Sequence, residues 1–296
     1  MPTSDAHARM QRILNEIFPP KVSDSQVTVH QRMLLGASIR QEFVERPGRD
    51  LASPMTRLMS SRKSSGGGRG GRLRLATELT LLWTLARSPH ATTRPHVVWA
   101  TLMGLEDPEG NGARSVKASL VELETRSLVK RDVRPWDGQS TVHLLKEDGS
   151  GEPYTIPNGH DEPYFRIPPT LWTTGLISRL SGPGLYMYVL AMELKRGRDI
   201  ALYFPEERLN ESYSLSSTTR KNGLKNLVDE GVLRPARASL DDFGGISHQR
   251  RARKIYVLDP TYDFPPHPQR QMQHSLSSPP HALAPGESWF KAISQR

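Results

Sequence analysis

The chain has 296 residues and no cysteine, and it carries a formal net charge of +9 at pH 7. The lack of cysteine excludes disulfides, thiolate catalysis and cysteine-ligated zinc, and it favours a reducing, cytoplasmic location. No apolar run approaches the roughly 20 residues of a membrane span, and the N-terminus lacks a signal-peptide core, so we expect no membrane partner. The basic excess favours a polyanionic partner.

Residues 1–50 are predicted to form a helical N-terminal segment. An amphipathic helix over 4–17 places Met10, Ile13, Leu14 and Ile17 on one side. A second candidate helix runs from about residue 25 to 44 and ends before Pro47. The pattern allows these helices either to pair with each other or to dock on the core.

Residues 51–72 are predicted to be a flexible basic arm. Their centre reads S-S-R-K-S-S-G-G-G-R-G-G-R, which holds no apolar residue for a core. Both an inert linker and an arm that contacts phosphates fit this composition.

Residues 73–146 show an order of helix, helix, helix and hairpin, and we predict one domain there. A strongly apolar helix starts near Leu73, and a shorter one covers about 95–105. An acidic, glycine-rich turn follows, and then a helix from Ala113 runs into a strand. The return strand is predicted at Thr141 to Leu145, after a turn at 135–138.

A second domain is predicted over residues 163–259, after a linker at 147–162 that is rich in glycine, proline and acidic residues. It begins with a strand at Tyr164–Ile167 and an irregular stretch, 168–178. An apolar helix at Ser181–Lys195 and a short helix at Pro205–Tyr213 follow. Residues 260–296 are rich in proline, histidine, glutamine and serine, and we predict a disordered tail.

The stretch 214–258 organises this second domain. Leu224, Leu227 and Val228 fall at i, i+3 and i+4, which is one buried stripe of an amphipathic helix. Gly223 allows another helix to approach closely, and Gly231 stands where a left-handed C-cap is expected. The chain then leaves the helix as the first strand of a basic hairpin.

The opposite side of this helix is polar. It carries Thr218, Lys221, Asn222 and Lys225, and Ser216 or Ser217 is a good N-cap. An ordinary amphipathic helix with solvated cations has the same pattern. The glycines, the turn into a strand and the basic second strand favour a helix that binds DNA.

Sliding the sequence by 104 positions aligns the third helices of the two domains, so that Ser115 falls on Thr219 and Lys117 on Lys221. Both copies resemble the recognition helix and wing of winged helix-turn-helix DNA-binding proteins, a class that includes GntR-like and MarR-like regulators. Two such units in tandem also resemble plasmid replication initiators. The resemblance implies an α+β, mainly helical fold with two winged-helix domains in tandem.

The resemblance also implies which residues contact DNA. Polar side chains of the second copy are expected in the major groove: Ser217, Thr218, Lys221, Asn222 and Lys225. The matching positions of the first copy are Ala113, Arg114, Lys117, Ala118 and Val121, of which Arg114 and Lys117, together with Ser115, are DNA-binding candidates. The wing of the second copy would lay basic residues along phosphates: Arg250, Arg251, Arg253 and Lys254.

Arg220 replaces a residue that is usually apolar, so we expect it to reach outward and bind a phosphate. Because the first copy has alanines and a valine at reading positions, the roles are predicted to be unequal. The second copy would read bases, and the first would position the protein. The prediction fails if Thr218, Lys221 and Asn222 are covered by the chain and no hairpin follows Gly231.

The sequence therefore predicts a sequence-specific, double-stranded DNA-binding protein, serving as a replication initiator, partition or regulatory factor of a plasmid, phage or integrative element. A chromosomal transcriptional regulator is one alternative, and a protein-interaction scaffold is another. A homodimer, or a protein partner bound through the first copy or the tail, also fits. We expect no cofactor, metal or catalytic centre. The acid pairs Glu206-Glu207 and Asp241-Asp242 are interpreted as a helix start and a turn.

Overall fold

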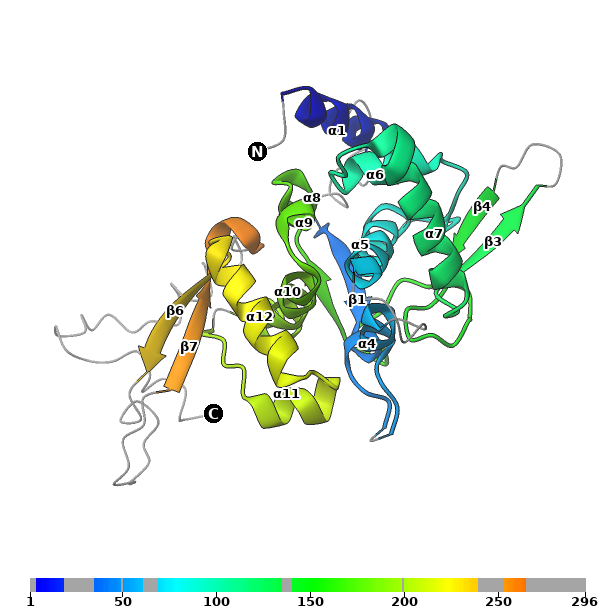
Figure 1. The fold of residues 1–296 in the computed structure, drawn as a ribbon. Coiled ribbons are helices and arrows are strands. Elements are labelled where there is room, and N and C mark those ends of the chain that lie inside the picture. The colour runs from blue at the N-terminus through cyan, green and yellow to red at the C-terminus, as the bar shows by residue number, and fades with distance from the viewer. Residues whose placement is uncertain are drawn as a thin grey trace, which may run out of the picture.

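The computed structural model describes residues 4–18, 35–48, 50–60, 69–134, 140–198, 200–238 and 253–264. The fold is α+β and mainly helical, as predicted. Figure 1 shows helices gathered in the middle of the molecule, with two β-hairpins that project away from each other on opposite sides. None of the described helices has the length and apolar character needed to span a bilayer.

The first half of the chain contains one set of elements, which we call the first unit (residues 37–144). It begins with the strand β1 (Ala37–Arg40). The helices and strands that follow are α3 (Gln41–Val44), α4 (Pro54–Met59), α5 (Arg69–Thr84), β2 (Ala91–Thr92), α6 (His96–Leu102), a π-helical turn (Pro108–Gly112), α7 (Ala113–Glu124), β3 (Val129–Val133) and β4 (Ser140–Leu144). The last three strands form an antiparallel sheet of order β2-β4-β3.

The second half repeats this order, and we call it the second unit (residues 164–258). It comprises β5 (Tyr164–Ile167), α8 (Thr170–Thr173), α9 (Leu176–Arg179), α10 (Gly182–Lys195), α11 (Glu206–Tyr213), α12 (Ser217–Asp229), β6 (Leu233–Ala238) and β7 (Arg253–Leu258). β6 pairs with β7, and Leu202 forms a single bridge to Tyr256 of β7. The order Leu202-β7-β6 matches β2-β4-β3.

The backbone confirms the repeat of 104 residues. α7 starts at Ala113 and α12 at Ser217, and β3 and β6 keep the same spacing. Both helices end in a left-handed residue, Ser127 with φ 57° and Gly231 with φ 71°. The next amide closes the turn in each unit: Leu128 donates to the Leu123 carbonyl (3.1 Å), and Val232 to that of Leu227 (2.8 Å). Such a turn satisfies the last carbonyls of a helix.

The core lies around α5 and α10, which contact each other. Every side chain of α10 from Leu185 to Met192 is buried. The indole of Trp83 on α5 stacks on that of Trp172 on α8, with ring centroids 4.3 Å apart. Burial of so much apolar and aromatic surface from both units makes them parts of one hydrophobic core.

The strands β1 and β5 join the two units, pairing antiparallel from Ala37↔Ile167 to Arg40↔Tyr164. The predicted helix over 25–44 is therefore wrong for residues 37–40, and residues 25–34 lie outside the described part. Ile39 and Phe43 are fully buried. Local periodicity favoured a helix, but the pairing partner comes from the far half of the chain, which no local pattern reveals.

The predicted basic arm over 51–72 is also wrong where the structure describes it. Ser53 caps α4 by accepting a hydrogen bond from the Thr56 amide (3.2 Å). Met55 and Leu58 are fully buried. α5 already begins at Arg69, before the predicted Leu73. The basic composition of the whole stretch concealed a short apolar helix, and residues 61–68 lie outside the described part.

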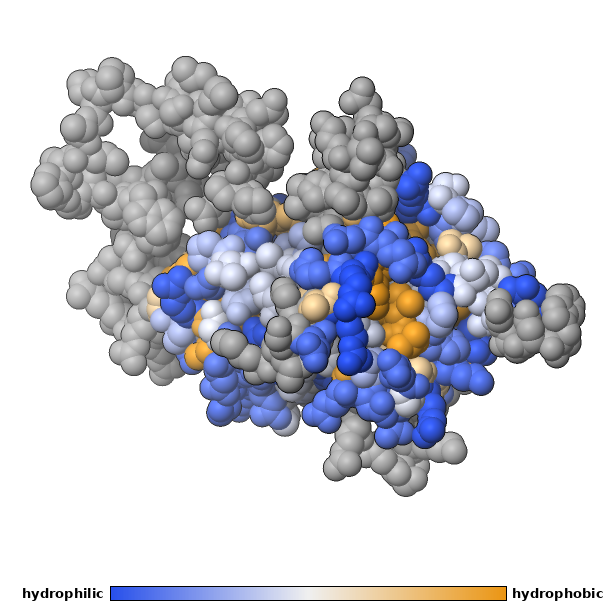
Figure 2. Space-filling view, turned by 90° about the horizontal axis from the view of Figure 1, so that it is seen from above, coloured by the Kyte–Doolittle hydropathy of each residue, from blue (hydrophilic) through white to orange (hydrophobic). Residues whose placement is uncertain are grey.

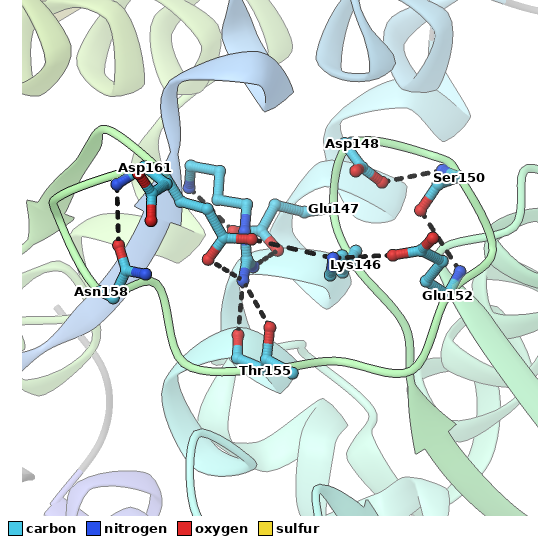
Figure 3. A network of polar contacts seen from close by, with 10 residues as sticks. Lys146, Glu147, Asp148, Ser150, Glu152, Thr155, Asn158 and Asp161 are labelled. Atoms are coloured by element: carbon cyan, nitrogen blue, oxygen red, sulfur yellow. Dashed lines mark hydrogen bonds and ion pairs between the residues drawn. The ribbon is translucent and has the colours of Figure 1, made fainter.

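The predicted linker over 147–162 is anchored by a buried ion pair. The Arg40 guanidinium Nη1 lies 2.8 Å from Glu147 Oε2, and both side chains are almost wholly inaccessible to solvent. Its Nη2 donates to the carbonyl and hydroxyl oxygens of Thr155 and to Glu162. Figure 3 shows the loop from Lys146 to Asp161 wrapped around this network. The segment is thus fixed to β1 and is not a loose linker.

Helix α1 (Ser4–Ile17) docks on the core. Met10, Leu14 and Phe18 are buried, and the Phe18 ring lies 5.2 Å from that of Trp83. An ion pair between Glu16 and Arg94 ties α1 to the segment before α6. Figure 2 views the molecule from the side on which α1 lies: this face is mostly hydrophilic, with a hydrophobic area near its middle. The structure thus favours docking over a separate helical pair.

The predicted disordered tail begins with a short ordered stretch. A 3-10 turn covers Pro260–Tyr262, and the Tyr262 carbonyl accepts a hydrogen bond from the buried Tyr188 hydroxyl (3.0 Å). Asp263 pairs with Lys195 at 2.5 Å. These contacts fix residues 260–263 to α10, so the tail starts later than predicted. Residues 265–296 lie outside the described part.

Candidate nucleic-acid interface

Helix α12 is held in place by its cap and by its buried side. The Ser216 hydroxyl accepts from the Thr219 amide (3.2 Å), which confirms the predicted N-cap. A Cβ on Gly223 would lie 2.4 Å from both Met187 Cγ and the Pro183 carbonyl oxygen, so α10 approaches as closely as a glycine allows. With Leu224 and Leu227 buried against the core, the outer side of α12 has a fixed orientation.

The outer side of α12 is polar and accessible. Thr218, Lys221, Asn222 and Lys225 are exposed. Lys225 forms a solvated ion pair with Asp229 one turn later (2.6 Å). The β6/β7 hairpin follows Gly231. The predicted orientation of this helix and the presence of a hairpin beyond it are therefore confirmed.

The prediction that Arg220 reaches outward is wrong. Its Nη1 donates to the Phe204 carbonyl (3.1 Å), and its Nη2 lies 2.6 Å from Glu206 Oε2. Only 19% of the side chain is exposed. At the matching position of the first unit, Val116 is fully buried. The position therefore faces inward in both units. In the second unit, the Arg220 guanidinium pairs with Glu206 at the start of α11 and does not extend toward solvent, where a DNA phosphate would lie.

Glu206 is a residue of this surface that sequence reasoning missed. A hydrogen bond from Ser217 lowers the pKa of its carboxyl group, and the charges of Arg220 and Lys221 act in the same direction. The carboxylate therefore lies among the residues that begin α12. An arginine at a usually apolar position was the signal for such an acid, because a half-buried guanidinium needs a counter-ion.

Two further side chains brace α12 and were also missed. The Asn226 Oδ1 accepts from the Ser181 amide (2.8 Å) and hydroxyl (2.9 Å) at the start of α10. At the other end, Arg179 pairs with Glu230 (2.9 Å). Neither contact has a signal in the local sequence. Both fix the angle at which α12 presents its outer side.

The described strands of the hairpin carry part of the predicted basic set. Lys254 is exposed, and its ammonium lies 5.3 Å from the centroid of the Tyr256 ring. Arg253 begins β7, although only its backbone is described, and Arg250 and Arg251 lie outside the described residues. Lys254 thus lies in the same unit as the polar side of α12, on the second strand of the hairpin that follows this helix.

In the first unit, α7 presents a less polar surface. Arg114 and Lys117 are exposed, and Arg114 donates to the Asn111 side chain (3.1 Å). Ala118 is exposed, and so is Val121 at 42%. Ser115 is half-buried. The sequence-based contrast between the two helices is present on the surface.

The start of α6 in the first unit differs from the start of α11. Its first residue is His96, whose pKa is lowered by partial burial and by the positive charges of Lys117 and Arg131. Arg131 is held by Glu124, with Nη2 2.6 Å from the carboxylate. A neutral imidazole therefore occupies the place at which the second unit carries an acid.

The two surfaces lie on either side of the core. Figure 1 shows α7 and α12 flanking α5 and α10, each with its own hairpin beyond it. Among the residues that the structure describes, no group of three or more histidine, aspartate or glutamate side chains is arranged to hold a metal ion. The chain matches no protein-family model, no curated protein and no solved structure.

Proposed function

We propose that the chain is a sequence-specific, double-stranded DNA-binding protein built from two winged-helix units. The observation that carries the proposal is the outer side of α12. Thr218, Lys221 and Asn222 are exposed there over a buried leucine stripe, and a hairpin with an exposed Lys254 follows. A helix of this kind, with polar residues at its N-terminal end, suits a major groove.

The two units take unequal parts in this proposal. The second unit reads base edges through Lys221 and Asn222, because an amide and an ammonium are the groups that pair with purine edges. The first unit offers Arg114 and Lys117 to phosphates, which fixes the position and the register of the protein. The net charge of +9 adds sequence-independent attraction to the duplex.

Within this class we propose a replication initiator, partition or regulatory factor of a plasmid, phage or integrative element, with a chromosomal transcriptional regulator as the alternative. The repeated order of elements supports the first reading, because two units in one chain resemble plasmid initiators. A footprint on DNA that flanks the gene separates the two. Repeated direct sites support an initiator, and one palindrome over a promoter supports a regulator.

Duplex binding measured across a series of salt concentrations tests the proposal. A DNA reader should show a steep fall in affinity with salt and a specific footprint. Neutralisation of each phosphate by a lysine or arginine contributes about 0.9 to the logarithmic slope. Negligible binding to any duplex at physiological salt would reject DNA binding as the function.

A protein-interaction scaffold remains the second candidate, because one observation favours it. Val121 on α7 is 42% exposed and Val133 on β3 is 56% exposed, so the first unit presents apolar side chains where a reader of DNA would carry polar ones. If Val121→Asp abolishes capture of a protein partner while duplex binding is absent in the unaltered chain, the scaffold is the better description.

A further inference from the structure

The start of α11 carries an acid in a place where a protein that attracts DNA phosphates would not be expected to have one. Glu206 is the first residue of α11, and its carboxylate bonds to Arg220 Nη2 at 2.6 Å. Ser217, the first residue of α12, lies near enough to lower the pKa of this carboxyl group. Arg220 of α12 therefore holds the carboxylate beside the N-terminal end of that helix.

The carboxylate keeps capacity for another donor. Its side chain is 53% exposed, and the bond from Arg220 goes to Oε2. An ionised carboxylate has two oxygens and about four lone-pair sites, and it can only accept hydrogen bonds. Arg220 thus orients Glu206 and leaves acceptor sites toward solvent.

The chemistry of the duplex restricts what can meet this carboxylate. Phosphates repel it, so the favourable contact open to it on a duplex is with base edges, once α12 lies in the major groove. Only two groups donate hydrogen bonds there, the N4 amino group of cytosine and the N6 amino group of adenine. Adenine places the N7 acceptor beside its amino group, which repels a carboxylate, whereas cytosine has no neighbouring acceptor on its own edge.

We propose that Glu206 is a specificity-determining residue of the second unit and accepts a hydrogen bond from the N4 amino group of one cytosine in the bound site. The inference rests on the proposed function, and it names a base that the unit reads. Arg220 is the positioning residue, because it holds the carboxylate while its own guanidinium is taken up by Glu206 and Phe204.

The first unit lacks this reader. Its equivalent helix begins with His96, which carries no carboxylate. The cytosine contact is therefore a property of the second unit alone. Within the second unit, Glu207 offers a matched control, since it is an exposed glutamate in the same helical turn and no bond from it to a described residue is found.

The test selects bound duplexes from a pool of random sequence, using the full chain, Glu206→Gln and Glu207→Gln. The unaltered chain should prefer cytosine at one position by about tenfold or more. Glu206→Gln should lose that preference or turn it toward adenine, because an amide both donates and accepts and so matches N6 and N7. Glu207→Gln should keep it.

A third variant tests the role of Arg220. Arg220→Met should weaken the cytosine preference and leave the preferences at the other positions in place, which a general loss of folding would not do. Thermal unfolding of each variant shows whether the fold is kept.

The idea is overturned by a cytosine preference that survives in Glu206→Gln, by its loss from both glutamine variants alike, or by specific binding of the unaltered chain without any such cytosine. These outcomes differ from failure of the proposed function, in which the unaltered chain selects no duplex at all.

Discussion

The helices α7 and α12 share a backbone and differ in the surface they present. Both start at the same point of the 104-residue repeat and end in a left-handed residue, Ser127 or Gly231. Ser119 is buried in the first unit, and at the matching position of the second Gly223 lies against α10. On the outer side, Ala118 of the first unit stands where the second has Asn222.

The difference teaches which positions the fold constrains. Inward positions must keep small or apolar side chains, because two helices pack there at close range. Outward positions touch only solvent, so they are free to diverge with the role of each unit. The shared backbone is thus evidence of one architecture, and the exposed residues carry the evidence of function.

The largest expected effect on stability is at the place where β1 and β5 join the two units, beside the ion pair of Arg40 and Glu147. Arg40→Met should lower the free energy of unfolding by about 3–5 kcal/mol, because Glu147 is left buried without its cation. Denaturant unfolding measures this. Arg166→Met on the paired strand β5 is the control, and as an exposed site it should cost less than about 1 kcal/mol. An equal loss of unfolding free energy in the two variants would show that the ion pair of Arg40 and Glu147 does not hold the units together.

The second prediction separates the roles of the two helices. Replacing both Lys221 and Asn222 by alanine should remove the preference at the base pairs that these two residues contact, a loss of about 2 kcal/mol or more between specific and random duplex. Replacing Arg114 and Lys117 by alanine should instead weaken binding to every duplex and reduce the salt slope by up to about 2. Titration of both duplexes at several salt concentrations distinguishes these patterns. Discrimination that persists at those base pairs in the first double variant would contradict base reading by α12.

The third prediction compares the close contacts of the two helices. Gly223→Ala should destabilise the fold by about 1–3 kcal/mol, because its Cβ would lie 2.4 Å from the Pro183 carbonyl oxygen. Ser119→Ala removes only a hydroxyl that donates to the Ser115 carbonyl (2.9 Å), so it should cost at most about 1 kcal/mol. Thermal and denaturant unfolding measure both. A Gly223→Ala variant as stable as the original would show that α10 and α12 can move apart.

The smallest expected effect is a pH dependence of stability that arises from a buried acid on one of the two central helices, α5 and α10. Burial raises the pKa of Glu78 on α5 well above its usual range, with a further rise from Glu147. Glu193 on α10 is also buried, but it accepts a hydrogen bond from the Tyr213 hydroxyl (2.8 Å). Of these two buried acids, Glu78 has no hydrogen-bond partner among the described residues, whereas Glu193 has one.

Because the folded chain holds the Glu78 proton more tightly than the unfolded chain does, its stabilising effect is full below the unfolded pKa and is lost as pH rises through the folded one. Glu78→Gln removes this dependence. From pH 4 to pH 5 the stability of the original should fall by about 0.8 kcal/mol relative to the variant. If the free energy of unfolding of the original chain and that of Glu78→Gln changed with pH in the same way, the prediction would be wrong, and Glu78 would be ionised in the folded chain.

The local sequence is sufficient to predict a structural feature where the residue type there favours only a few conformations or contacts. The sequence predicts Ser216 or Ser217 as a cap, Gly231 as a left-handed turn, and Gly223 as a point of close approach, since each follows from the conformational freedom or hydrogen-bonding capacity of one residue. The hydrophobic stripe predicted α12 for the same reason. Half of the candidate site could therefore be predicted with its orientation.

The errors share a cause as well. Residues 37–40 form a strand only because β5 offers them a partner, and α4 is a helix in a stretch whose overall composition is that of a basic arm. Arg220 is expected to reach outward because it replaces a residue that is usually apolar. Glu206 and Phe204 become its neighbours only once α11 and α12 fold against each other.

By itself, the sequence determined α12 with its two ends, the repeat and the polar side of α12, because these depend on spacing along one segment. The tertiary structure decided which strands pair, which charges are buried and which acid faces the start of α12. Those contacts join residues far apart in the chain, and their energies arise only after the core has brought the segments together.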